Sequence, residues 1–352
     1  MSDPAQNNLF FEEILQLKNK IEASSVPEGL KEKISNMLVR LQRMTKYGGY
    51  SAEYDKTSHY ISWVLSLPWG KETQDNLDLN RAKETLDKHH YGMDNIKEKI
   101  IQYMAVLKLT QDQKKVSRAP IICLVGLVGT GKTTFGYALA EAMNRKFVRI
   151  PFGGIGSARD LRGQSRLHPD AEPGKVIKGL RLAQTSNPVI LMDEIDRVAD
   201  SGRSEVMGVL VELLDPEQNA AFTDHYIDYP VDLSNVLFLA TCNNTRGIAT
   251  AVLDRMQILQ MPSYTDDEKI HIGRDYILPN ALKESGLSKD LVTIDPNLWP
   301  KIVRPLGYDS GIRTLERNIE GICHKIAKKV VQGETDNFYI TDKNIKSFLP
   351  EW

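Results

Sequence analysis

The stretch that decides the fold is Gly126-Leu-Val-Gly-Thr-Gly-Lys-Thr133. The apolar run Pro120-Ile-Ile-Cys-Leu-Val125 comes before it, and Thr134-Phe-Gly-Tyr-Ala-Leu-Ala-Glu-Ala-Met143, which has a helical composition, comes after it. A strand, a glycine-rich loop and the start of a helix therefore follow one another in the order that a phosphate-binding P-loop requires. The sequence predicts that this protein binds a nucleoside triphosphate.

The residue types in this loop suit phosphate chemistry. Glycines let backbone N–H groups approach phosphate oxygens without a Cβ in the way, and the new helix points its positive end at the same place. Lys132 is placed to reach the β- and γ-phosphates, and the hydroxyl of Thr133 is placed to complete a Mg²⁺ shell. The other residues assigned to the phosphate cradle are Gly126, Gly129, Thr130, Gly131 and Thr134.

Composition narrows the class of protein. The chain has 352 residues, 41% of them hydrophobic and 26% charged, and its net charge of −1 predicts neither a nucleic-acid nor an anionic-membrane surface. The three cysteines, Cys123, Cys242 and Cys323, form no CxxC pair, which favours a reducing compartment over a disulfide framework or a zinc site. With no membrane-length apolar run and no targeting pattern at the N-terminus, we predict a cytoplasmic protein.

The first part of the chain predicts a helical arm over residues 1–70. Apolar residues recur at helical spacing from Asn8 to Glu22 and again from Pro27 to Met44. A third helix is predicted from Ser51 to Leu67, where Pro68-Trp69-Gly70 ends it. This segment offers no clustered polar chemistry, so we expect it to pack on the next domain or on a neighbouring chain.

Residues 71–262 are predicted to form the nucleotide-binding domain. Two helices are expected between residues 76 and 109, separated at His90-Tyr91-Gly92, followed by a polar loop over residues 110–118. His90, Tyr91 and Ile96 lie just upstream of the P-loop and are candidates to line the adenine. Core packing is about equally expected for Tyr91 and Ile96.

The pattern after the P-loop strand is an alternation of strands and helices. Short continuous apolar strands separated by helices predict an α/β fold with a mostly parallel five-stranded sheet covered on both faces. Ligands bind such sheets at the carboxyl ends of the strands. The five runs are Ile121–Val125, Phe147–Ile150, Val189–Met192, Val236–Ala240 and Ile258–Met261.

Two of these runs deliver polar groups to that edge. Val189-Ile-Leu-Met-Asp193-Glu194 places Asp193 to hold Mg²⁺ through water and Glu194 to activate the water that attacks the γ-phosphorus. The alternative, a strand-end Asp-Glu that merely begins a loop, is disfavoured by the complete P-loop upstream. Asn243 ends the next run and is a candidate to read the γ-phosphate, although an Asn after a strand is usually only a turn.

Two arginines are further candidates. Arg255 lies before the last strand, where it is placed either to reach the nucleotide of a neighbouring subunit or simply to be solvated. The alternation stops after Pro262, and residues 263–352 predict a small helical lid domain. Its helices are expected over Asp266–Ile277, Pro279–Ser285, Pro296–Val303 and Ile312–Val331, with a short strand-like stretch at Phe338-Tyr-Ile340. The most strongly amphipathic helix begins at Gly311-Ile312-Arg313. Arg313 is a candidate to contact the nucleotide as this lid moves.

At this point the sequence resembles the ATPase module of the Lon family of ATP-dependent proteases, over roughly residues 25 to 350. The strings that carry the resemblance are Gly126…Thr133, Arg145-Lys-Phe-Val-Arg149, Asp193-Glu-Ile-Asp196, Leu214-Asp-Pro-Glu-Gln-Asn219, Phe222-Thr-Asp-His-Tyr226, Leu253-Asp-Arg-Met256, Gly311-Ile-Arg313, Leu65-Ser-Leu-Pro-Trp-Gly70, Asn76-Leu-Asp-Leu79 and His90-Tyr-Gly92.

The resemblance implies an AAA+ fold that binds ATP and Mg²⁺ between the subunits of a homohexameric ring, and a pore through which unfolded or damaged protein is threaded for proteolysis. It places Asn243 at the sensor-1 position, Arg255 at the arginine finger and Arg313 at sensor 2. It also implies that Lys132 and Thr133 belong to Walker A, and that Asp193 and Glu194 belong to Walker B.

Three departures qualify this expectation. The family's proteolytic domain would begin where the chain ends at Glu351-Trp352, so we expect either an excised ATPase piece or a Lon-like ATPase without its own peptidase. Only the last helices of the N-terminal domain are expected. The pore loop carries His168-Pro169 in place of an aromatic–aliphatic pair, and the second pore loop, Ser201-Gly-Arg-Ser-Glu205, also differs from the family pattern.

These departures leave two functions in competition. The first is a Lon-type ATPase that powers unfolding and translocation for proteolysis and protein quality control. The second is a nucleotide-gated scaffold that holds a partner, such as a separate peptidase or a full-length Lon, without threading it. An AAA+ protein that loads clamps or remodels DNA is disfavoured by the near-neutral charge.

Overall fold

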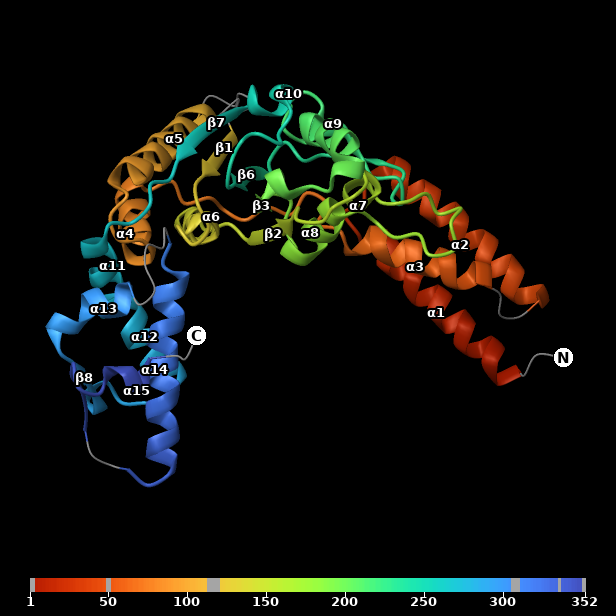
Figure 1. The fold of residues 1–352 in the computed structure, drawn as a ribbon. Helices are drawn as coiled ribbons and strands as arrows, with labels where there is room; N and C mark the ends of the chain where they lie inside the picture. The colour runs from red at the N-terminus through yellow and green to blue at the C-terminus, as the bar shows by residue number, and fades with distance from the viewer. Residues whose placement is uncertain (1–3, 49–51, 113–120, 305–310, 335–336, 350–352) are drawn as a thin grey trace.

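The computed structural model describes residues 4–48, 52–112, 121–304, 311–334 and 337–349. The loop predicted over residues 110–118 begins later than expected, because residues 110–112 still belong to helix α5 (Asp94–Asp112); the rest of it and the chain end at Glu351-Trp352 lie outside these ranges. Figure 1 shows a central α/β region with the N-terminal helices extending from one side and the C-terminal helical lid hanging from the other. The division at residues 70 and 262 stays a prediction.

The central sheet confirms the predicted strands. All of its neighbouring strands pair in parallel, in the order β2-β3-β6-β1-β7. A parallel sheet is stable only when both faces are covered, which explains why its strands are apolar almost throughout. The strands are β1 (Ile121–Val125), β2 (Phe147–Pro151), β3 (Val189–Asp193), β6 (Leu237–Cys242) and β7 (Met256–Gln260).

The two faces of the sheet bury different partners because successive side chains alternate between them. Ile122 and Leu124 enter one core together with α4 (Leu79–His89), α5 (Asp94–Asp112) and α6 (Lys132–Ala142). Cys123 and Val125 enter the other core, which α8 (Lys175–Ala183) and α9 (Arg203–Leu213) cover. Sequence analysis had foreseen α4, α5 and α6 but had not assigned α8 and α9.

The predicted arm is present as α1 (Pro4–Glu22), α2 (Glu28–Gly48) and α3 (Ala52–Ser66). Its buried residues, among them Ile14, Ile34 and Ile61, belong to the same continuous core as β2, β3, α8 and α9. The hydroxyl of Tyr60 donates to the carbonyl of Ile227 at 2.9 Å, which is a second tie between α3 and the central region. The arm packs on the next domain, as one of the two alternatives expected.

The lid contains the predicted helices and one unforeseen pairing. The expected break at Pro279 is wrong: α11 (Asp266–Ile272) continues through a π-helical turn, Gly273–Ile277, into α12 (Leu278–Glu284). Pro279 is tolerated because the π-helical turn just before it shifts the backbone hydrogen bonding, with the N–H of Leu278 donating to the carbonyl oxygen of Gly273. The strand-like stretch expected at Phe338-Tyr-Ile340 is β9 (Phe338–Ile340), and it pairs in parallel with β8 (Val292–Ile294), a three-residue strand that was not predicted.

The remaining lid helices are α13 (Trp299–Val303), α14 (Arg313–Val331) and α15 (Ile345–Phe348). The remaining short elements of the central region are α7 (Arg159–Arg162), α10 (Thr250–Leu253), β4 (Phe222–Thr223) and β5 (Pro230–Val231). No helix in the described ranges is both long enough and apolar enough to span a membrane.

Candidate functional site: a nucleotide cradle between the sheet and the lid

The glycine-rich loop connects β1 to α6 in a conformation that only glycine adopts easily. Gly129 and Gly131 have φ values of 84° and 86°, in the left-handed region. A Cβ on Gly126 would lie 2.8 Å from the carbonyl oxygen of Met261, and a Cβ on Gly131 would lie 2.8 Å from His90 Cε1. These positions exclude side chains, so no Cβ of Gly129 or Gly131 stands between the loop backbone and a phosphate, whereas the N–H of Gly126 donates to the carbonyl oxygen of Cys242 at 3.2 Å.

Lys132 begins α6 and reaches back into the loop. Its Nζ donates to the carbonyl oxygens of Gly126 at 2.6 Å and Leu127 at 2.9 Å, and to Asn243 Oδ1 at 3.1 Å. Burial lowers the pKa of the Lys132 ammonium group, and the nearby Asp193 carboxylate opposes that shift. The structure thus brings Lys132 and Asn243 together, because β1 and β6 are neighbours in the sheet.

The two adjacent carboxylates end β3 at the same edge. Asp193 accepts hydrogen bonds from the Thr241 hydroxyl at Oδ1 and from the Arg149 guanidinium at Oδ2. Glu194 has a φ of 58°, and its N–H donates to Thr241 Oγ1 at 3.0 Å. This left-handed turn aims the two carboxylates differently although they are consecutive residues. Glu194 Oε2 lies 3.6 Å from the Arg197 guanidinium.

Asp196 orients the segment that carries Asn243. Its Oδ2 accepts from the backbone N–H of Asn243 at 3.1 Å and from that of Asn244 at 3.4 Å. Within the described residues its Oδ1 is buried without a hydrogen-bond partner. Asp196 therefore ties the end of β6 to the turn after β3, which is why the amide of Asn243 faces Lys132.

The beginning of α14 lies directly on the glycine-rich loop. The Ile312 N–H donates to the carbonyl oxygen of Gly129 at 3.1 Å, and a Cβ on Gly311 would lie 2.4 Å from the carbonyl oxygen of Val128. Arg313, the first residue of α14, is exposed, and its Cγ would lie 3.4 Å from a Cβ on Gly129. The structure thus brings Arg313 to the loop, although the two are far apart in the sequence.

Gly311→Ala is expected to separate the lid from the glycine-rich loop, because its Cβ would overlap the carbonyl oxygen of Val128. We expect a loss of about 1–3 kcal/mol in the free energy of unfolding and weaker nucleotide binding. Denaturant unfolding and nucleotide titration measure the two effects. Gly208→Ala on α9 is the matched control, because a Cβ there meets nothing within 4 Å and both quantities should be unchanged or slightly improved.

The three candidate adenine residues have different surroundings. His90 is buried and stacks on Phe135, with ring centroids 3.6 Å apart, and its Nε2 has no hydrogen-bond partner in the described part of the chain. Tyr91 is half-buried and lies against His271 of the lid, with ring centroids 4.1 Å apart. Ile96 lies on α5 and is buried in the core between that helix and the sheet. His90 and Tyr91 border the cradle, whereas Ile96 has a packing role in this structure.

The stability of the fold is expected to fall as the pH is lowered through the range in which only the unfolded His90 titrates. Burial, with help from Lys97, lowers the pKa of His90 from 6.5 to about 3. Between those values the unfolded chain binds the proton and the folded chain does not, so unfolding is favoured by up to about 1.4 kcal/mol per pH unit. Denaturant unfolding at pH 7, 6 and 5 measures this loss of unfolding free energy. The loss should be smaller in His90→Phe, which keeps the ring stacking but has no imidazole to bind a proton in the unfolded chain.

Arg255 stands apart from this group. In the described residues it contacts Asp215, whose Oδ2 lies 3.3 Å from its Nη2, and it donates to the carbonyl oxygen of Ala251 at 2.8 Å. The backbone N–H of Glu217 and the Arg255 guanidinium both lower the pKa of Asp215. Arg255 is thus held at the surface before β7 rather than in the cradle of its own chain.

The threonines of the loop occupy three environments. Thr130 is fully buried and donates to the carbonyl oxygen of Leu127 at 2.9 Å, so its hydroxyl supports the loop. Thr133 is half-buried and Thr134 is exposed. Among the described residues no three His, Cys, Asp or Glu side chains are arranged to hold a metal ion.

The segment expected to form the pore loop, residues 163–174, is held by buried hydrogen bonds where it ends and is exposed at its tip. Asp224 is buried and accepts from the N–H groups of Gly174 at 2.7 Å and Tyr226 at 2.8 Å. The Arg166 guanidinium lies over the Tyr60 ring of the arm, 4.0 Å from its centroid, and 3.6 Å from Asp228. Leu167 is 91% exposed, so the tip presents an aliphatic side chain one residue before His168.

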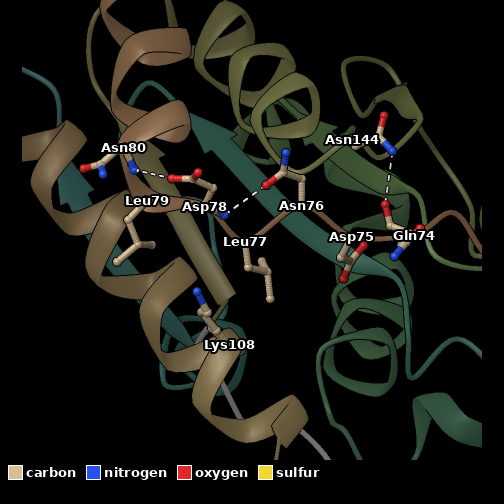
Figure 2. Close-up of a pocket in the computed structure, with 9 residues that line it drawn as sticks. All are labelled: Gln74, Asp75, Asn76, Leu77, Asp78, Leu79, Asn80, Lys108 and Asn144. Atoms are coloured by element: carbon tan, nitrogen blue, oxygen red, sulfur yellow. Dashed lines mark hydrogen bonds between the residues drawn. The ribbon is translucent and has the colours of Figure 1, made fainter.

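A cavity of about 790 Å³ lies at the other edge of the sheet, where the strands begin (Figure 2). It is lined by the extended segment from Gln74 to Asn80 together with Lys108 and Asn144. Asp75, which is part of this lining, forms a buried ion pair with Arg145 at 2.6 Å. None of the residues predicted from the nucleotide motifs lines this cavity, so it is separate from the cradle.

Comparison with known proteins decides the family. Residues 122–264 match the ATPase family associated with various cellular activities (AAA), and residues 283–339 match the Lon protease AAA+ ATPase lid domain. The chain carries a Lon-type AAA+ ATPase module. The sheet and the lid that form the cradle are the two matched regions.

Its relatives include Lon proteases along almost its whole length. It is 43% identical over 319 residues to the Lon protease of Desulforamulus reducens, covering 91% of this chain and 39% of that protein. It is 40% identical over 337 residues to Lon protease 1 of Bacillus subtilis, covering 96% of this chain and 43% of that protein. The chain thus spans about two fifths of the length of the curated Lon relatives it matches.

Sequence reasoning missed the residues that position the Lon-type site. Arg149, Thr241 and Asp196 each contact a predicted site residue or its backbone, and none of them had been given a role. One signal was available: an arginine and a threonine inside otherwise apolar strands are unusual, because a buried strand leaves polar groups unpaired. Asp215, the partner of Arg255, carried no comparable signal.

Proposed function

We propose that this Lon-type module hydrolyses ATP with Mg²⁺ and uses the energy to unfold and translocate protein for ATP-dependent proteolysis and quality control. The observation that carries the proposal is the convergence of a glycine-lined loop, Lys132, Asn243, two strand-end carboxylates and the start of α14 at one edge of the sheet. A site that hydrolyses ATP needs hydrogen-bond donors for the phosphate oxygens, a metal ligand and a base close together. We propose that this edge of the sheet supplies all three.

The chain's own residues divide the work of this reaction. The loop N–H groups and Lys132 bind the phosphates, and Lys132 must exchange its contacts with the Gly126 and Leu127 carbonyls for phosphate oxygens. Glu194 takes the proton of the attacking water, which Asn243 orients. Arg313 approaches from the lid, and His90 and Tyr91 border the adenine.

The donor set also fits Mg²⁺. Thr133 supplies a hydroxyl beside the loop, and Asp193 supplies a carboxylate at the neighbouring strand end; hydroxyl and carboxylate oxygens are the ligands that this ion prefers. When bound, Mg²⁺ neutralises charge that develops on the β- and γ-phosphates. Asp193 and Thr133 are proposed to hold it.

The position of Arg255 suits a site that a second copy of the chain completes. Arg255 is held away from its own cradle by Asp215 and Ala251, so we propose that it reaches the nucleotide of the next subunit in a hexameric ring. Unfolded protein is the proposed substrate, and the exposed Leu167 the proposed contact on the pore loop. We place this machine in the cytoplasm because all three cysteines are free thiols.

A nucleotide-gated scaffold is the second candidate. The observation that favours it is the bracing of the 163–174 loop on the arm by Arg166, together with His168 and Pro169 near its tip. A loop held in this way and lacking an aromatic grip suits holding a partner, either a peptidase or a full-length Lon, more than threading a chain.

One measurement separates the two candidates: ATP turnover per protomer as a function of protein concentration, with and without a denatured protein. A ring motor predicts turnover that rises with concentration and rises again with the denatured chain. A scaffold predicts nucleotide binding with turnover that is flat and insensitive to the denatured chain.

A further inference from the structure

Arg149 is the charged partner of the carboxylate proposed to hold Mg²⁺. It lies on β2, opposite Leu191 and two residues before the position opposite Asp193, so its side chain shares a face with that carboxylate. Its Nε and Nη2 each lie 2.6 Å from Asp193 Oδ2. One charge-assisted hydrogen bond, from Nε, and one ion-pair contact, from Nη2, therefore converge on a single oxygen.

The second oxygen of Asp193 is also engaged. Oδ1 accepts from the hydroxyl of Thr241 on β6, so both oxygens have donors from the protein. A water bound to Mg²⁺ also approaches a carboxylate as a hydrogen-bond donor. Arg149 thus uses the lone pairs that the water shell of the metal needs, and its positive charge repels the ion as well.

The two partners differ in their freedom to move. The Asp193 side chain is 5% exposed, whereas that of Arg149 is 52% exposed. The guanidinium can leave for solvent without opening the core, while the carboxylate is fixed at the end of β3. The contact is therefore reversible at the arginine.

We propose that Arg149 is a positioning residue that occupies Asp193 Oδ2 in the nucleotide-free chain and must release it when Mg²⁺ arrives with the nucleotide. Arg149 thereby sets the Mg²⁺ concentration at which the site fills, and it keeps Asp193 paired when the site is empty. This inference rests on the proposed function, because it concerns the same nucleotide cradle.

The test compares affinity for ADP, by titration calorimetry, over a series of Mg²⁺ concentrations and in EDTA. In Arg149→Met, the affinity in EDTA should match that of the unaltered chain, because Asp193 is not needed for Mg²⁺-free binding. The Mg²⁺ concentration for half of the affinity gain should fall by about three- to tenfold, since one competing charged contact is gone and it is partly screened by solvent. Arg149→Lys should lie between the two.

Arg197→Met is the matched control. The Arg197 side chain is also 52% exposed and lies at the same edge, but it pairs with Glu194 rather than Asp193. Removing it changes the local charge equally and should leave the Mg²⁺ requirement unchanged. Thermal unfolding verifies that each variant is folded, and Arg149→Lys, which keeps the charge, serves if Arg149→Met is not.

The outcomes separate the inference from the function beneath it. A Mg²⁺ requirement in Arg149→Met that is unchanged, or that rises because Asp193 has lost its support, would overturn the inference and leave nucleotide binding intact. An equal fall in Arg197→Met would also overturn it, because a general field effect would then explain the result. An unaltered chain that binds no ADP in either buffer would overturn the proposed function, and this inference with it.

Discussion

Glu194→Gln is expected to bind ATP as tightly as the unaltered chain and to hydrolyse it about 10²- to 10⁴-fold more slowly. The amide keeps the size and the hydrogen-bonding shape of the side chain but cannot accept the proton of the attacking water. Within the described part of the chain no hydrogen bond joins Glu194 to Lys132 or to the glycine-rich loop, so phosphate binding should not change. ATP binding by calorimetry and turnover by phosphate release measure the two quantities.

The control for Glu194→Gln is a variant that loses a carboxylate far from the nucleotide cradle. Glu334→Gln, on the lid surface, removes the same charge from a side chain that only pairs with Lys329, and it should turn over normally. Retained turnover in Glu194→Gln would remove this carboxylate from the mechanism. Equal loss of binding and turnover would point instead to a disturbed loop, since the Glu194 N–H shares Thr241 with Asp193.

Arg255→Ala is expected to lower turnover by about 10³- to 10⁵-fold, with nucleotide affinity nearly unchanged, if the arginine completes a neighbouring site. The sharper experiment mixes Arg255→Ala with Glu194→Gln, each inactive alone. In mixed rings about a quarter of the interfaces combine an intact Glu194 from one subunit with an intact Arg255 from the next. We therefore expect turnover to return on mixing, to roughly a quarter of the value of the unaltered chain.

One outcome of the mixing experiment would contradict a role of Arg255 in the neighbouring site. No recovery, with ring assembly shown by light scattering, would place Arg255 and Glu194 in the same site or give Arg255 a structural role. Asp215→Asn is the matched control, because it releases Arg255 from its ion pair without removing the guanidinium. That variant should hydrolyse ATP at least as fast as the unaltered chain.

Strong local patterns predicted the elements that form the cradle. The apolar runs identified all five strands of the sheet, and the order strand, Gly126–Thr133, helix fixed where β1 ends and α6 begins. Asn243 could be placed beside Lys132 because parallel strands end at one edge of the sheet. Such inferences need only periodicity and the handedness of parallel connections.

The contacts that sequence could not predict depend on three-dimensional register. Arg149 meets Asp193 because Pro151, two residues further on, lies opposite that carboxylate on the neighbouring strand. Gly311 contacts Val128 because the start of α14 in the lid packs against the glycine-rich loop. The continuation of α11 through a π-helical turn was missed for a different reason: Pro279 signals a break, and only the packing of the lid shows that its ring is accommodated.

The shared core of the arm and the sheet has a mechanical consequence. A segment tied by a flexible linker transmits no bending load, but α3 is joined to the central region by buried apolar side chains and by the Tyr60 hydroxyl. Arg166 extends that joint to the 163–174 loop. A force pulling on the tip of the loop is therefore passed through Arg166 and Tyr60 to α3 and to the core that α3 shares with the sheet, rather than being carried by the loop alone.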